Sequence, residues 1–147
     1  MRRRTFVRSA TWGGAATVLW LAGSLTALSD TAGPTDLIQE EEVVVNMRLR
    51  QFEPATVLLH SGRKTKLVFH NLDAELHAFV PVKLFTGVNL NISGNGAPEF
   101  SDEGLKRVII PPDGRTEIRF IPSQAGTFPF SCDMPGHEMR AAIIVQE

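Results

Sequence analysis

Short apolar or alternating segments recur along the chain after residue 42, and turn-forming residues separate them. The clearest segment, residues 116–121, alternates polar and apolar side chains, which is the pattern of a half-buried strand. It follows Pro111-Pro112-Asp113-Gly114, where proline presets φ and glycine permits positive φ. Comparable segments lie at residues 43–50, 56–60, 65–70, 78–81, 105–110, 127–131 and 141–145. About seven to eight short strands separated by turns predict an all-β fold, a β-sandwich.

Two segments do not fit the strand pattern. Phe52-Glu53-Pro54 interrupts the alternation between the first two predicted strands. Residues 82–104 are rich in asparagine, glycine and serine, and they show no sustained apolar period. We expect this second segment to be a long loop that contains at most one helical turn.

The first 29 residues have the composition of a targeting segment. Four arginines among the first eight residues precede an apolar stretch at residues 10–28, as in a signal peptide. The pair Arg3-Arg4 resembles a twin-arginine signal. The same stretch is long enough to remain as an uncleaved membrane anchor. We therefore expect export to the periplasm or another extracytoplasmic compartment. Residues 30–42 are predicted to form an acidic linker, and residues 43–147 a single domain.

The exported part of the chain is acidic and lacks large indole and phenol rings. After residue 29 it contains 11 basic residues and all 16 acidic ones, so its net charge is −5. This balance disfavours nucleic acid as a partner. Both tryptophans, Trp12 and Trp20, precede this part, and the chain has no tyrosine. The core must therefore consist of phenylalanine and branched aliphatic side chains.

Cys132 is the only cysteine, and it lies within eight residues of Met134, His137 and Met139. Exported proteins usually use cysteines in pairs, as disulfides, which a single cysteine cannot form within one chain. An inert buried thiol is one interpretation, but the histidine five residues later favours a metal ligand. Soft sulfur ligands together with imidazole select copper. His77, far upstream, is the candidate for a second imidazole ligand.

These residues resemble the cupredoxin family, the small blue-copper proteins. The resemblance covers about residues 43–147, and it rests on Phe52-Glu53-Pro54, on Gly62 before a strand, on residues 71–79 and on residues 132–145. The family implies a Greek-key sandwich with one copper ion at one end. It also implies that His77, Cys132 and His137 bind that ion, with the first histidine on a middle strand and the others on the loop between the last two strands.

The axial ligand departs from the family pattern. The family usually places a methionine three to five residues after the loop histidine, but Arg140, Ala141 and Ala142 stand at those positions. Met139 lies only two residues after His137, although it leads into the last strand as the family's methionine does. We take Met139 as the candidate axial ligand, with Met134, a backbone atom or water as alternatives. A weak or absent axial ligand chiefly tunes the reduction potential.

Four other polar residues call for an interpretation. Asn71 and Ser131 are candidates for hydrogen bonds around the ligands, because outer-shell contacts orient and tune them. His60 and His70 end predicted strands, and we expect both to be surface residues. Copper binding needs a deprotonated thiol and imidazoles that are neutral on the metal side, so we expect it to weaken at low pH.

The sequence thus predicts an exported carrier of single electrons rather than an enzyme. It would meet redox partner proteins as a monomer in weak, transient contacts, through a face around His137 made apolar by Met134, Pro135 and Met139. Membrane contact is expected only if the N-terminal segment is retained. The alternative is copper handling, by a chaperone or sensor that holds and releases Cu(I). Thiol chemistry at Cys132 is disfavoured, because no oxyanion-hole motif or orienting acid is identifiable.

Overall fold

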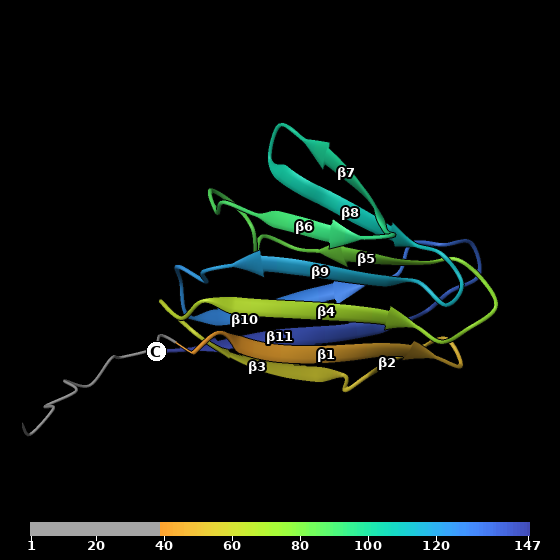
Figure 1. The fold of residues 1–147 in the computed structure, drawn as a ribbon, viewed down its shortest axis with the longest axis horizontal. Helices are drawn as coiled ribbons and strands as arrows, with labels where there is room; N and C mark the ends of the chain where they lie inside the picture. The colour runs from red at the N-terminus through yellow and green to blue at the C-terminus, as the bar shows by residue number, and fades with distance from the viewer. Residues whose placement is uncertain (1–38) are drawn as a thin grey trace, which may run out of the picture. The chain divides into compact units, whose positions relative to one another are not determined.

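The structure is a computed structural model, and it describes residues 39–147. Across these residues eleven β-strands form two sheets that enclose a common core (Figure 1). The predicted signal or anchor segment, residues 1–29, and most of the predicted linker lie outside the described residues. Between residues 39 and 147 no helix is long and apolar enough to cross a bilayer.

The first sheet contains five strands in the order β2-β1-β4-β9-β6. They are β1 (Glu41–Arg48), β2 (Gln51–Glu53), β4 (Thr65–Asn71), β6 (Asn91–Gly94) and β9 (Arg115–Phe120). Strand β1 runs parallel to β4 from the pair Glu41 and Thr65 onward. The last two residues of the predicted acidic linker therefore belong to the sheet.

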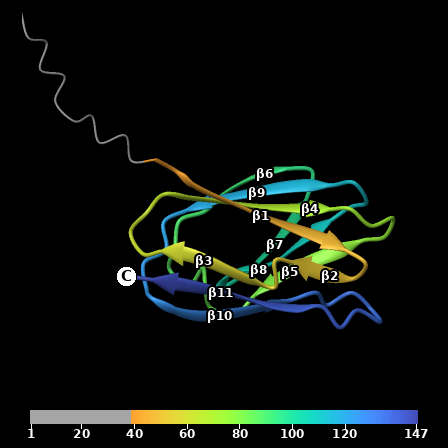
Figure 2. The ribbon, with the colours of Figure 1, turned by 90° about the horizontal axis from the view of Figure 1, so that it is seen from below.

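The second sheet contains six strands in the order β3-β11-β10-β5-β8-β7. They are β3 (Thr56–His60), β5 (His77–Pro81), β7 (Ala97–Ser101), β8 (Gly104–Ile110), β10 (Gly126–Ser131) and β11 (Arg140–Gln146). The chain changes sheet between β2 and β3, β3 and β4, and β4 and β5, and again on both sides of β6 and of β9. Figure 2 shows the resulting layers, with β6 and β9 on one side and β10 and β11 on the other. The predicted all-β Greek-key sandwich is confirmed, with more strands than the seven to eight expected.

The additional strands lie in the two segments that the sequence pattern did not assign. Phe52-Glu53 is part of β2, which returns antiparallel to β1. Residues 82–104 are not one long loop, because they contain β6 and β7, which pair with β9 and β8. All three strands lie at sheet edges and expose most of their side chains. A strand that buries so little side chain needs no apolar alternation, which is why the sequence did not reveal it.

Phenylalanine rings fill the centre of the core, as the composition predicted. The Phe79 ring centroid lies 4.2 Å from that of Phe69 and 5.3 Å from that of Phe130. The Phe69 and Phe79 side chains are fully buried, and branched aliphatic side chains surround them. Offset and edge-to-face ring pairs add to the free energy gained from burial. This packing holds β5 in place, and β5 begins at His77.

Candidate metal centre

His77, Cys132 and His137 converge at one end of the sandwich. His77 is the first residue of β5, Cys132 directly follows β10, and His137 lies in the loop between β10 and β11. The Cys132 Sγ atom is 3.4 Å from His137 Nδ1 and 4.0 Å from His77 Nδ1. The two Nδ1 atoms are 3.2 Å apart. One sulfur and two imidazole nitrogens from segments more than fifty residues apart therefore face a common point.

A tight turn presents His137 toward Cys132. The His137 amide donates a hydrogen bond to the Met134 carbonyl at 3.0 Å, which closes the turn. Pro135 and Gly136 occupy its centre, and Gly136 has φ +77°. Proline at the second position and a positive φ at the third are typical of a type II turn. The prediction that proline and glycine shape this loop is consistent with the observed geometry.

Met139 lies directly beside Cys132 at the end of the same loop. The Cys132 amide donates to the Met139 carbonyl at 3.1 Å, which continues the pairing of β10 with β11. The Met139 side chain is buried in the core. Met139 therefore does not contribute to an apolar outer face, contrary to our expectation. Its buried position next to Cys132 suits an axial thioether, and the axial role itself stays a prediction.

The Cys132 sulfur accepts a hydrogen bond from the backbone. The Ala78 amide donates to Sγ at 3.2 Å, and Cys132 itself is buried. This donor fixes the direction in which the sulfur points and gives it a polar partner inside the core. The amide belongs to β5 immediately after His77, so one strand both supplies an imidazole and stabilises the sulfur ligand.

Asp73 holds the outer nitrogen of His77. Its Oδ2 atom lies 2.7 Å from His77 Nε2. The amides of Leu49 and Arg50 donate to the same carboxylate at 2.8 and 3.0 Å. Both residues have positive φ, 52° and 57°, in the turn between β1 and β2. Burial alone would raise the pKa of Asp73, but the hydrogen bonds from the Arg50 amide and from His77 outweigh it, so the pKa of Asp73 is lowered. A carboxylate only accepts, so Nε2 is the nitrogen that donates to Asp73, and Nδ1 faces Cys132 and His137.

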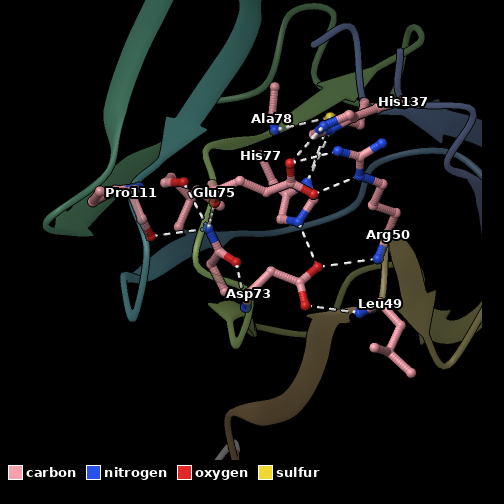
Figure 3. Close-up of polar contacts among 11 residues, drawn as sticks. Leu49, Arg50, Asp73, Glu75, His77, Ala78, Pro111 and His137 are labelled. Carbon is pink, nitrogen blue, oxygen red and sulfur yellow. Dashed lines mark hydrogen bonds and ion pairs between the residues drawn. The ribbon is translucent and has the colours of Figure 1, made fainter. Parts of the chain in front are cut away.

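Glu75 lies against the outer nitrogen of His137. Its Oε2 atom is 3.4 Å from His137 Nε2 (Figure 3). Arg50 donates to both Glu75 oxygens, from Nε at 2.6 Å and from Nη2 at 2.7 Å. The hydrogen bond from Arg50 lowers the pKa of Glu75. The His137 side chain is only 5% exposed, and this ion pair lies at its outer nitrogen.

Asn71 organises the segment that carries these residues. Its buried Nδ2 donates to the carbonyls of Glu75, Ile110 and Pro111 at 2.8, 3.0 and 3.0 Å. Its Oδ1 accepts from the Asp73 amide at 3.0 Å. Asn71 therefore does hydrogen-bond around the site, through the backbone of the loop rather than through a ligand atom. In the described part of the chain the Ser131 hydroxyl forms no hydrogen bond.

The remaining two histidines lie away from this cluster. His60 ends β3 half-buried, with Nδ1 2.9 Å from Glu41 Oε1. His70 is half-buried within β4. Neither belongs to a group of metal-ligating side chains among residues 39–147. Both are less exposed than predicted, because each strand is held against a neighbouring strand up to that residue.

The cluster resembles a type 1 copper site. His77, Cys132 and His137 offer three ligand atoms that all lie within 4.8 Å of one another. Two imidazoles and one thiolate with a weak axial thioether form the donor set of blue copper centres. A carboxylate at each outer imidazole nitrogen leaves both Nδ1 atoms free for a metal. The residues present therefore fit one copper ion.

Sequence reasoning assigned no role to three residues that surround the ligands, Asp73, Glu75 and Arg50. Asp73, Glu75 and His77 alternate along the chain, a spacing that could have indicated one cluster of side chains. Arg50 carries no such signal, because it is 25 residues from Glu75. Arg50 reaches this end of the sandwich only because it lies in the turn where β2 returns antiparallel to β1.

Comparison with known proteins supports the same fold, both by sequence and by structure. The sequence profile of the cupredoxin-like domain matches residues 15–145. Auracyanin A, a blue copper protein of Chloroflexus aurantiacus, has a TM-score of 0.56 and 14% sequence identity, covering 74% of this chain and 100% of its own. Auracyanin B has a TM-score of 0.54 and 18% identity, covering 73% of this chain and 89% of its own. A Cu(I) form of an amicyanin variant has a TM-score of 0.50 and 16% identity, covering 74% and 85%. No curated protein sequence matches the chain.

Proposed function

The chain belongs to the family of cupredoxin-like domains, and from this premise we propose that it carries single electrons between redox partner proteins. In this proposal His77, Cys132 and His137 bind one copper ion, with Met139 as the axial ligand. A bound copper ion would alternate between Cu(I) and Cu(II) and so pass one electron at a time. The observation that supports the proposal is the convergence of two Nδ1 atoms and one Sγ atom on one point.

The surrounding residues hold these three donors in place. Asp73 and Glu75 orient the two imidazoles, and the Ala78 amide orients the sulfur. His77 begins β5, and Cys132 and His137 lie in the short connection between β10 and β11, so the backbone positions the ligands and the metal does not have to gather them. A site of this kind changes little when its metal changes charge, which is what electron transfer requires.

We propose that the domain is exported, works as a monomer and docks transiently to its redox partners. Exposed leucines at the copper end supply apolar contacts: Leu49 is 76% exposed, Leu76 48% and Leu72 44%. They take the place of Met139 on the apolar face that we expected around His137. Small contacts of this type suit short-lived redox complexes. The proposal includes no catalytic step.

The test is a copper titration of the full-length protein, followed by visible absorption, EPR of the Cu(II) form and voltammetry. An intense thiolate-to-copper band and a reversible one-electron couple are the expected results. A protein that binds Cu(I) tightly but shows neither would be a copper chaperone or sensor instead. A protein that binds no copper would contradict both functions.

Replacing Met139 with leucine is expected to raise the reduction potential without abolishing copper binding. The leucine fills a similar buried volume, so the fold and the three strong ligands remain. Loss of the weak axial donor lowers the coordination number of the copper ion, which Cu(I) tolerates better than Cu(II), and this tunes the potential upward. Voltammetry and a copper titration measure the two effects. Met134→Leu, in the same loop but only half-buried, is the matched control and should leave the potential unchanged. Loss of copper in the Met139 variant, or an unchanged potential, would contradict the axial assignment.

A further inference from the structure

The outer side of His137 is covered by one ion pair. The guanidinium of Arg50 donates two hydrogen bonds to the Glu75 carboxylate, and that carboxylate lies 3.4 Å from His137 Nε2 (Figure 3). The Arg50 and Glu75 side chains are 53% and 37% exposed, whereas that of His137 is 5% exposed. The pair therefore lies between the imidazole and solvent, and its own two side chains are partly exposed to solvent.

Both partners of this pair are anchored through their backbones. The Glu75 carbonyl accepts from the buried Asn71 side chain, and the Arg50 amide donates to Asp73. Arg50 adopts φ 57° in the same turn whose amides donate to the Asp73 carboxylate. Ion pairs with solvent access contribute little to stability. Such firm placement is instead what a precisely oriented outer-shell contact requires.

We propose that the Arg50–Glu75 ion pair positions His137 and balances the affinities of the site for Cu(I) and Cu(II). This inference rests on the proposed function. The Glu75 carboxylate faces His137 Nε2 at 3.4 Å, while His137 Nδ1 lies 3.4 Å from Cys132 Sγ on the other side of the ring. The opposite charges of Arg50 and Glu75 offset each other at the metal position. Removing either charge leaves the other uncompensated, and Cu(II) carries one more positive charge than Cu(I), so the two removals act with opposite sign.

The test compares Arg50→Gln, Glu75→Gln and the double variant by voltammetry at low ionic strength. Glu75→Gln leaves the Arg50 charge and is expected to raise the ratio of Cu(I) to Cu(II) affinity about threefold to tenfold, a range that allows for solvent screening. Arg50→Gln leaves the Glu75 charge and is expected to lower the ratio by a similar factor. A tenfold change corresponds to about 59 mV for a one-electron couple. The double variant should lie close to the wild type.

Lys66→Gln is the matched control, since it breaks the Lys66–Glu42 ion pair at the start of β1 and β4, away from the cluster. It should leave the potential unchanged. The opposite shifts of the two single variants should shrink in high salt, because screening weakens exposed charges. Shifts in the same direction, or no shift, would overturn the inference.

A measurement on the metal-free protein tests the positioning of His137 separately from the proposed electron transfer. In the metal-free protein, ¹⁵N NMR of the His137 ring should show a proton on Nε2 in the wild type and in Glu75→Gln, which keeps an acceptor. Glu75→Leu removes the acceptor and should shift the ring toward the other tautomer. An unchanged ring in Glu75→Leu would refute the positioning role even where copper binds. A wild type with no reversible copper couple would refute the proposed function, while the ring signals still decide the role of Glu75.

Discussion

A Cys132→Ser variant is expected to lose the intense visible band and to bind Cu(I) more than about a hundredfold more weakly, since even outer-shell changes cost up to that factor. Serine has nearly the same shape, so the buried position remains filled. Its hydroxyl is a hard donor that stays protonated near neutral pH, whereas the thiolate is a soft one that matches copper. The Ala78 amide still finds an oxygen acceptor, so the fold should persist.

Copper titration, visible absorption and circular dichroism of the Cys132 variant measure these effects. His60→Ala is the control, because it changes a half-buried histidine outside the cluster. It should keep both the band and the affinity. A band that survives in the serine variant, with the fold intact, would show that Cys132 is not the sulfur ligand. An equal loss in the His60 variant would point to a different copper site.

Replacing Phe79 with alanine is expected to lower the free energy of unfolding by about 3–5 kcal/mol. The Phe79 side chain is fully buried, and its ring contacts those of Phe69, Phe85 and Phe130. The variant loses the transfer free energy of the ring and leaves a cavity that its packed neighbours fill only in part. A loss of this size is a large fraction of the stability of a single domain.

Urea denaturation of the metal-free protein measures the loss at Phe79. Phe100→Ala is the matched control, because Phe100 is 61% exposed on the edge strand β7. It should change the free energy of unfolding by no more than about 0.5 kcal/mol. A Phe79 variant that loses less than about 1 kcal/mol would show that these rings do not form the centre of the core. Because Phe79 follows His77 on β5, the variant should also bind copper more weakly.

Features that depend on neighbouring residues could be read from the sequence. Alternation at residues 116–121 predicted what proved to be β9, and Pro111-Pro112-Asp113-Gly114 predicted the turn before it. The spacing of Cys132 and His137 around Pro135-Gly136 indicated a loop that presents two ligands. These signals are local, because strand period, turn chemistry and ligand spacing act over a few residues.

Features that depend on the path of the whole chain could not be read in this way. The edge strands β6 and β7 bury little, so they carry no periodic signal. The carboxylates of Asp73 and Glu75 look like ordinary loop residues until the fold places them against two imidazoles. Arg50 looks like an ordinary turn residue until the fold brings its guanidinium into hydrogen-bonding distance of Glu75.

By itself, the sequence determined the all-β class, the phenylalanine core and the residue types from which a copper site is built. Only the tertiary structure decided how these residues are surrounded: which backbone amide reaches the sulfur, which carboxylate orients each histidine, and that an ion pair covers His137. The physical reason is the range of the interactions. Strand and turn preferences act between neighbours in the chain, whereas hydrogen bonds and charges act through space between segments that only folding brings together.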